Sequence, residues 1–203
     1  MSDTVQAPQT RPSPTEKRFG WFLVATAAVA WIASFVLVLE RLELYKNPGH
    51  VTSCDINPWV SCGAVMQEWQ AALFGFPNPL LGIVGFAVVA TIGASLIAGA
   101  RFPRWYWVAT QIGVSFAFVF IVWLWSQALY SIHVLCLYCM VVWAMMIPMF
   151  VFTTSRNIVA GVFGASERVR RAVAEWAWVA AAGLLLLAAA SVLVSFSGVF
   201  FGS

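Results

Sequence analysis

Residues 134–152 read VLCLYCMVVWAMMIPMFVF, a run without a single charged side chain. A helix needs about 20 predominantly apolar residues to cross the hydrocarbon core of a bilayer, so this run predicts a membrane span. Four further runs meet the same criterion. The five predicted spans cover about residues 20–39, 79–100, 105–127, 134–152 and 176–200. We therefore expect an all-α integral membrane protein, with a four-helix bundle and the fifth helix as a peripheral scaffold.

The composition supports a membrane protein. Hydrophobic residues make up 62% of the 203 residues and charged residues 9%, whereas a soluble domain has about 25% charged residues. The spans leave no room for a separate globular catalytic domain, and we treat residues 19–203 as one membrane domain. Residues 1–18 lack apolar periodicity and predict a disordered cytoplasmic tail. The basic residues are dispersed among short loops, which excludes nucleic acid as a partner.

The basic residues also predict the topology. Nine of the eleven lie on one side of the predicted spans: Arg11, Lys17, Arg18, Arg101, Arg104, Arg156, Arg168, Arg170 and Arg171. Only Arg41 and Lys46 lie on the other side. Because cytoplasmic loops carry the excess of Lys and Arg, we expect a cytoplasmic N-terminus and an extracytoplasmic C-terminus, in a bacterial cytoplasmic (inner) membrane.

All four cysteines fall on the extracytoplasmic side in this topology. Cys54 and Cys62 lie in the only long external loop, at about residues 40–78, and Cys136 and Cys139 open the fourth span from the same side. Disulfides persist in such an oxidising compartment. We therefore predict that the four thiols form one redox site.

Cys136 and Cys139 form a C-x-x-C at the start of a predicted helix. The unpaired N–H groups and the dipole of a helix N-terminus favour thiolate there. Three residues at 1.5 Å rise place Cys139 about 4.5 Å deeper in the membrane than Cys136. The outer thiol is then accessible to protein and the inner one to a substrate in the lipid.

Cys54 and Cys62 are spaced to close a short loop disulfide that can reach an external partner or the C-x-x-C. Ser61 is a suitable N-cap for a helix that begins at Cys62 and continues to about Phe74. Apolar residues follow helical spacing on one side of this segment, at Val65, Met66, Trp69, Ala72 and Leu73, with Gln67, Glu68 and Gln70 opposite. This pattern predicts an interfacial helix that covers the site.

Three motifs together resemble the bacterial vitamin K epoxide reductase family: the C-x7-C loop, the C-L-Y-C at the fourth span, and Pro77-Asn78-Pro79-Leu80-Leu81-Gly82 before the second span. The resemblance covers about residues 20–155 and extends to the fifth helix. In bacterial members that helix often leads to a fused thioredoxin-like domain. This chain ends without one, so we expect the stand-alone form.

The resemblance implies a role for each cysteine. Cys54 exchanges with the redox partner, Cys62 pairs transiently with Cys136, and Cys139 lies next to a quinone. It also implies that Asn78 donates a hydrogen bond to a quinone carbonyl. One position departs from the family pattern: Glu68 stands six residues after Cys62, where a small hydroxyl residue is usual.

The resemblance further implies a quinone-dependent, disulfide-generating oxidoreductase. A DsbA-like thioredoxin-fold protein acts in trans as the electron donor, and the membrane quinone pool, menaquinone or ubiquinone, accepts the electrons. The enzyme then supports disulfide bond formation in secreted proteins. The unrelated four-helix disulfide-bond oxidases carry their C-x-x-C in the first external loop and the wider cysteine pair in the second. In this chain the wider pair comes first.

Aromatic residues near the thiols are candidates for packing a quinone ring: Trp59, Trp69 and Trp143. Aromatic residues also anchor membrane proteins at the membrane interfaces, and each of these tryptophans could instead be such an anchor. His133 lies near the C-x-x-C and is a candidate proton donor, because imidazole titrates near neutrality. It is equally suited to an interfacial turn.

Two other functions use the same residues. Four cysteines can hold zinc, but C-x7-C is wider than the usual spacing of paired ligands and an oxidising compartment consumes thiols, so we expect no metal. The chain could instead be a transporter or an assembly scaffold with structural disulfides. Ionisable residues inside the membrane usually mark a transport path, and the five predicted spans are nearly devoid of them.

Overall fold

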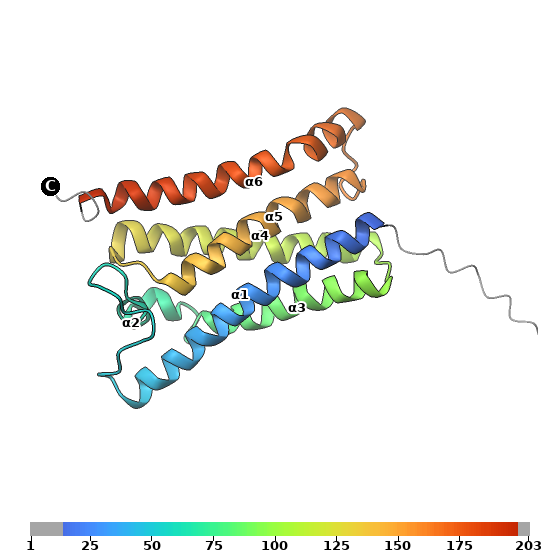
Figure 1. Cartoon of the computed structure of the whole chain (residues 1–203). Coiled ribbons are helices and arrows are strands. Elements are labelled where there is room, and N and C mark those ends of the chain that lie inside the picture. Colours follow the sequence, from blue (N-terminus) through green and yellow to red (C-terminus); the bar gives the residue numbers. More distant parts are fainter. Residues whose placement is uncertain (1–13, 199–203) are drawn as a thin grey trace, which may run out of the picture.

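The computed structural model describes residues 14–198, and these residues form helices and no β-strand (Figure 1). Five helices are long and apolar enough to cross a membrane, which confirms the predicted fold class. They are α1 (Pro14–Lys46), α3 (Pro79–Ala98), α4 (Arg104–Gln127) with its π-helical extension η2 (Ala128–Ile132), α5 (Leu137–Val159) and α6 (Glu167–Ser195). The loop after α1 contains a short helix, α2 (Cys62–Gln67), and a 3₁₀ turn, η1 (Trp69–Ala72).

Small residues bring α1 against α3 along most of their length. The carbonyl of Gly20 lies so close to Gly93 that a Cβ at position 93 would overlap it. Close backbone approach at small residues is the usual way in which membrane helices pack. α1 also packs on α5, α4 packs on α5, and α6 packs chiefly on α5, so α6 lies at the periphery as expected. α3 and α4 scarcely touch along their lengths.

The two ends of the bundle differ in content. The N-terminal end of α1, the α3–α4 turn and the α5–α6 loop lie at one end, where the basic residues gather (Figure 1). The long loop with α2, the η2 turn and the C-terminal end of α6 lie at the other end. The four cysteines therefore share the end that is poor in basic residues.

A buried polar cluster ties the helices together at the basic end. Asn157 is fully buried, and its Nδ2 donates to Gln111 Oε1 at 3.0 Å and to the Trp107 carbonyl at 3.4 Å. Arg156 donates to Glu16 at 3.1 Å and lies over the Trp107 ring. These contacts join α1, α4 and α5 far from the cysteines.

Two helices extend beyond the predicted membrane spans. α1 begins at Pro14 and continues to Lys46, so residues 14–18 are helical and the loop starts at residue 47. α6 begins at Glu167, well before the predicted start of the fifth span. Both extensions carry charged residues that are good helix formers, and an apolar criterion misses them. The rest of the predicted tail, residues 1–13, and residues 199–203 lie outside the described residues.

Candidate functional site

A short backbone pairing sets the position of the loop relative to α5. Val60 forms a parallel bridge with Leu135, in which Leu135 N donates to the Trp59 carbonyl at 2.8 Å and Ser61 N donates to the Leu135 carbonyl at 2.9 Å. Phe196, from the turn that ends α6, is buried against Leu135. The pairing fixes the register of the two segments, so that residue 62 lies beside residue 136.

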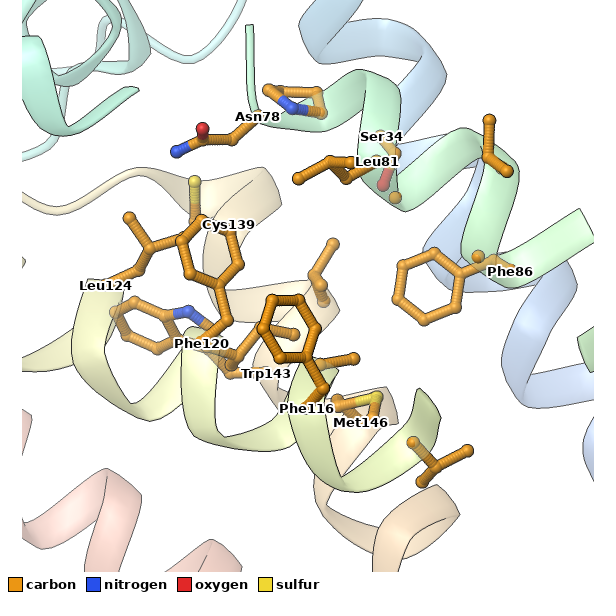
Figure 2. Close-up of a pocket in the computed structure, with 18 of the residues that line it drawn as sticks. Ser34, Asn78, Leu81, Phe86, Phe116, Phe120, Leu124, Cys139, Trp143 and Met146 are labelled. Atoms are coloured by element: carbon orange, nitrogen blue, oxygen red, sulfur yellow. The ribbon is translucent and has the colours of Figure 1, made fainter. Parts of the chain in front are cut away.

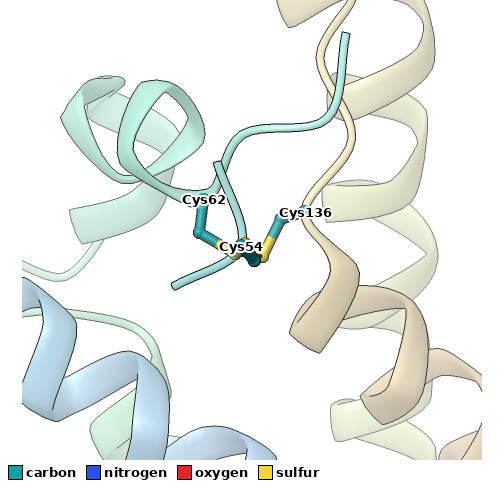
Figure 3. A group of neighbouring side chains, drawn as sticks. All are labelled: Cys54, Cys62 and Cys136. Atoms are coloured by element: carbon teal, nitrogen blue, oxygen red, sulfur yellow. Dashed lines mark hydrogen bonds between the residues drawn. A yellow bond between two sulfur atoms is a disulfide. The ribbon is translucent and has the colours of Figure 1, made fainter. Parts of the chain in front are cut away.

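Those two residues are cysteines, and their sulfurs are in contact (Figure 3). Cys54 and Cys62 form a disulfide, with their Cα atoms 5.6 Å apart. The Sγ of Cys62 also lies 3.2 Å from the Sγ of Cys136, which is a free thiol. The exposed fraction is 0% for Cys54 and Cys62 and 2% for Cys136. A thiolate exchanges with a disulfide by attacking one of its sulfurs, and this contact places the Cys136 sulfur within reach of Cys62.

The three sulfurs lie within 4.8 Å of one another, a spacing that also suits a metal ion. Zinc binds cysteine as thiolate. Two of the three sulfurs are bonded to each other, so they offer no thiolate pair. In this redox state the cluster is arranged for disulfide exchange.

Cys136 is the N-cap of α5, as the sequence predicted for the C-x-x-C. Its Sγ accepts a hydrogen bond from the backbone N–H of Cys139 at 3.4 Å. The first-turn N–H groups and the helix dipole both favour negative charge on this sulfur. Cys139 is the second free thiol and lies within the first turn of α5, partly buried.

Two carboxylates that the sequence analysis did not single out hold the loop around the disulfide. Asp55 Oδ1 accepts from Ser61 Oγ at 2.6 Å and from Gly63 N at 3.1 Å, and Oδ2 accepts from Thr52 N at 2.7 Å. On the other side, Glu40 accepts from Ser53 N at 3.0 Å. Asp55 directly follows Cys54, whereas Glu40 lies in α1, and nothing in the sequence pattern indicates which backbone groups either carboxylate binds.

The hydrogen bonds to Asp55 change its titration. Partial burial raises the pKa of this carboxyl, but the bonds from Ser61, Thr52 and Gly63 outweigh that effect and lower the pKa to about 2. A carboxyl whose pKa falls on folding stabilises the fold at pH values above its unfolded pKa, and this stabilisation is lost as the pH falls through the folded pKa. The loop should therefore stay closed at pH 4.

We expect a small phosphine to reduce the Cys54–Cys62 disulfide slowly between pH 7 and pH 4, and faster as the pH approaches 2. In Asp55→Asn the reduction should already be fast at pH 7, because an amide cannot accept all three hydrogen bonds. The rate is measured by thiol labelling and divided by the rate for a small disulfide peptide at the same pH. A wild-type loop that opens near pH 4 would contradict this role of Asp55.

An apolar cavity of about 610 Å³ lies below the cysteines, where α3 and α4 separate (Figure 2). Cys139, Asn78 and Trp143 line its outer end, and Cys136 also reaches its wall. Aromatic and aliphatic side chains line the rest, among them Phe86, Phe116, Phe120, Leu124 and Met146. Small-molecule sites combine such an apolar wall with a few placed polar groups. The cavity therefore has the lining of a site for an apolar small molecule, and the Cys139 thiol lies on its wall.

Asn78 precedes α3 and is buried, with an exposed fraction of 8%. Its Nδ2 donates to the Gln70 carbonyl at 2.6 Å, and its Oδ1 accepts from Leu73 N at 3.3 Å. A primary amide carries two N–H groups, so one remains for a ligand in the cavity. Asn78 thus anchors the η1 turn and also lines the cavity.

Three of the predicted quinone contacts do not line this cavity. Trp59 is exposed in the loop, and Trp69 is 63% exposed and packs against Trp123 instead. His133 is exposed and adopts a left-handed backbone conformation (φ 58°) at the end of η2. Only Trp143 of the predicted aromatic set reaches the cavity wall.

The helix predicted from Cys62 to about Phe74 was correct only at its start. Ser61 is the N-cap and its side chain accepts from Ala64 N, as expected. The helix ends at Gln67, because the exposed Glu68 has an extended backbone that restarts the chain in the η1 turn. The break rotates the following residues, so Trp69 faces outward and Gln70 is buried at the cavity.

The sequence model of the vitamin K epoxide reductase family matches residues 21–154. This range includes all four cysteines, Asn78 and Trp143, and it ends within α5. No curated protein matches the chain.

Proposed function

The chain belongs to the vitamin K epoxide reductase family, and on this basis we propose that it is a membrane thiol:quinone oxidoreductase. In this proposal it oxidises an extracytoplasmic thioredoxin-fold partner and reduces a quinone of the membrane. The family is a membrane redox family, is generally quinone-linked, and generally works with thioredoxin-like partners. The product of the reaction with the partner is a disulfide that can be passed to secreted proteins.

One observation carries the proposal: Cys62 is disulfide-bonded to Cys54 and at the same time lies 3.2 Å from the thiol of Cys136. A thiolate of the partner attacks Cys54 and releases Cys62 as a thiolate, and the second thiol of the partner resolves the mixed disulfide. The partner is oxidised, and the loop pair gains two electrons. The loop pair then reduces a Cys136–Cys139 disulfide through a transient Cys62–Cys136 bond.

The inner pair completes the cycle at the cavity. Cys136 and Cys139 give two electrons and two protons to the quinone, which leaves as quinol, and they become a disulfide again. The described state has the loop pair oxidised and the inner pair reduced. In this cycle, it is the state that precedes electron transfer to the quinone. In this proposal Asn78, which lines the same cavity, donates its spare N–H to the quinone oxygen on which charge develops.

Access for the partner requires the loop to move. Cys54 is fully buried, and the segment before it is tied to α5 by Ser53 Oγ and Tyr138 Oη, which lie 3.1 Å apart. A partner thiolate must contact Cys54 along the disulfide axis, so this hydrogen bond and the Val60–Leu135 bridge have to open first.

The direct test mixes the purified chain with a reduced thioredoxin-fold protein and with menaquinone or ubiquinone in separate reactions. We expect one quinol for each partner disulfide that forms, and the better quinone identifies the physiological class. Cys136→Ser serves as the inactive control, because it removes the thiol that links the two pairs. Loss of partner thiols without quinol would contradict the proposal.

The topology is a separate prediction. A reporter that is active only in the cytoplasm should function when fused after Arg104 or Arg170 and fail when fused after Asn57, because basic residues are retained on the cytoplasmic side. The fusions are compared at equal expression in a bacterial inner membrane. Cytoplasmic activity at Asn57 would place the thiols on the reducing side and contradict the proposed function as well.

A further inference from the structure

Polar side chains are rare on the cavity wall, and most of them are already hydrogen-bonded. Thr110 Oγ1 donates to the Tyr106 carbonyl at 2.9 Å, and the Arg41 guanidinium donates to the Met66 carbonyl. Two cavity-lining atoms are not: Gln70 Oε1, an acceptor that is buried without a partner in the described part of the chain, and the hydroxyl of Ser34 on α1, which can also donate. The Ser34 hydroxyl forms no hydrogen bond within residues 14–198, although only 3% of the residue is exposed.

The orientation of Ser34 differs from that of several other hydroxyl residues in the spans; Thr153 of α5 also lacks a partner among the described residues, but it does not line the cavity. Thr26, Thr91 and Ser95 each donate to a carbonyl four residues earlier in their own helix, at 2.8 Å in each case. Ser34 instead directs its oxygen toward the cavity that Asn78 and Cys139 line (Figure 2). A buried hydroxyl without a partner lowers stability, so a ligand that supplies the missing hydrogen bond would bind favourably there.

Gly82 of α3 makes room for this hydroxyl. A Cβ at position 82 would overlap Ser34 Oγ, so any larger residue would displace the hydroxyl or separate α1 from α3. Gly82 lines the cavity beside Ser34. The absence of a side chain at this position thus leaves the oxygen accessible from the cavity.

Asn78 and Ser34 are separated along the axis of α3. Asn78 and Gly82 are four residues apart, which corresponds to about 6 Å along the helix at 1.5 Å per residue. Ser34 Oγ lies against Gly82, so it sits about one helical turn below Asn78. The two polar groups thus lie at different depths of the cavity, and a para-quinone carries its two oxygens on opposite sides of the ring, so that each oxygen can face one of them.

We propose that the Ser34 hydroxyl donates a hydrogen bond to the quinone carbonyl opposite the one that Asn78 contacts; this rests on the quinone-reducing function proposed above. A hydroxyl both donates and accepts. The contact therefore persists after reduction, when the carbonyl has become a quinol hydroxyl that donates to Ser34. Two fixed polar contacts across the ring would hold one edge of the head group toward Cys139.

The test compares purified full-length Ser34→Ala with Ser95→Ala. The control removes a hydroxyl that serves only its own helix. The KM for quinone is measured in both, together with the Ki of 1-tetralone, a competitor that carries one carbonyl on a similar ring frame. Loss of one neutral hydrogen bond should raise the KM of Ser34→Ala about threefold to tenfold. The Ki should stay within about twofold, because one carbonyl needs only Asn78.

Three results distinguish between a hydrogen bond from Ser34, a general packing defect and a failure of the proposed function. An unchanged KM in Ser34→Ala would overturn the contact. An equal rise in KM and Ki would also overturn it, since a general packing defect weakens both ligands alike. A wild-type protein that reduces no quinone would instead refute the proposed function itself, before Ser34 is tested.

Discussion

Removal of Cys54 and Cys139 together is expected to convert the site into a single stable Cys62–Cys136 disulfide. The two remaining sulfurs already lie 3.2 Å apart, and the Val60–Leu135 bridge holds their segments in register. Each single variant lacks one resolving thiol but keeps the other, so the mixed disulfide should accumulate only in part. In the double variant no neighbouring thiol remains to break it.

The disulfides are identified by peptide mapping under non-reducing conditions. Quinone turnover should fall on the order of a thousandfold or more in Cys139→Ala, because removal of a reacting group eliminates its chemical step. The matched control replaces Cys62 and Cys136 with alanine, and it should keep Cys54 and Cys139 as free thiols. A Cys54–Cys136 disulfide in the Cys139→Ala variant would show that the order of the relay is wrong.

Asn78→Ala is expected to lower quinone turnover by about tenfold to a thousandfold. Negative charge grows on the quinone oxygen during reduction, and a donor aimed at that oxygen stabilises the transition state more than the bound substrate. Removal of one such donor costs at most about 2.7–4 kcal/mol, or about a hundredfold to a thousandfold in rate, which sets the upper end of the expected range. Asn78 also holds the η1 turn, which adds to the loss.

The two half-reactions separate these roles of Asn78. Single-turnover oxidation of the partner should survive in Asn78→Ala, since that exchange occurs at Cys54. Asn157→Ala is the matched control, because it also removes a buried, hydrogen-bonded asparagine but at the opposite end of the bundle. It should lower thermal stability without a selective loss of quinone turnover. Equal losses in both half-reactions of Asn78→Ala would indicate a damaged fold.

Local rules predicted the parts of the site that depend on local sequence. Ser61 caps α2 and Cys136 caps α5, because N-capping depends on residues within one turn of the helix start. The five spans follow from apolar length alone. The family resemblance drawn from the cysteine motifs was confirmed over residues 21–154.

The inward-facing polar residues depend on long-range contacts, which periodicity does not report. Gln70 was assigned to the outer face because the pattern assumes an unbroken helix, and the extended backbone at Glu68 reverses the two faces. The sequence does not identify Ser34 as a binding residue, because a single serine in an apolar span is typical of close helix packing. Its exposure to the cavity follows from Gly82 on another helix.

The burial of all three sulfurs at the loop has a consequence for the surrounding compartment. Small thiols diffuse freely in such a compartment, and an exposed disulfide would exchange with them. A sulfur without accessible surface is insulated from such reagents, so only a protein large enough to displace the loop can exchange with it. If the chain reduces quinone as proposed, the closed loop prevents small thiols from passing electrons to the quinone pool without forming a protein disulfide.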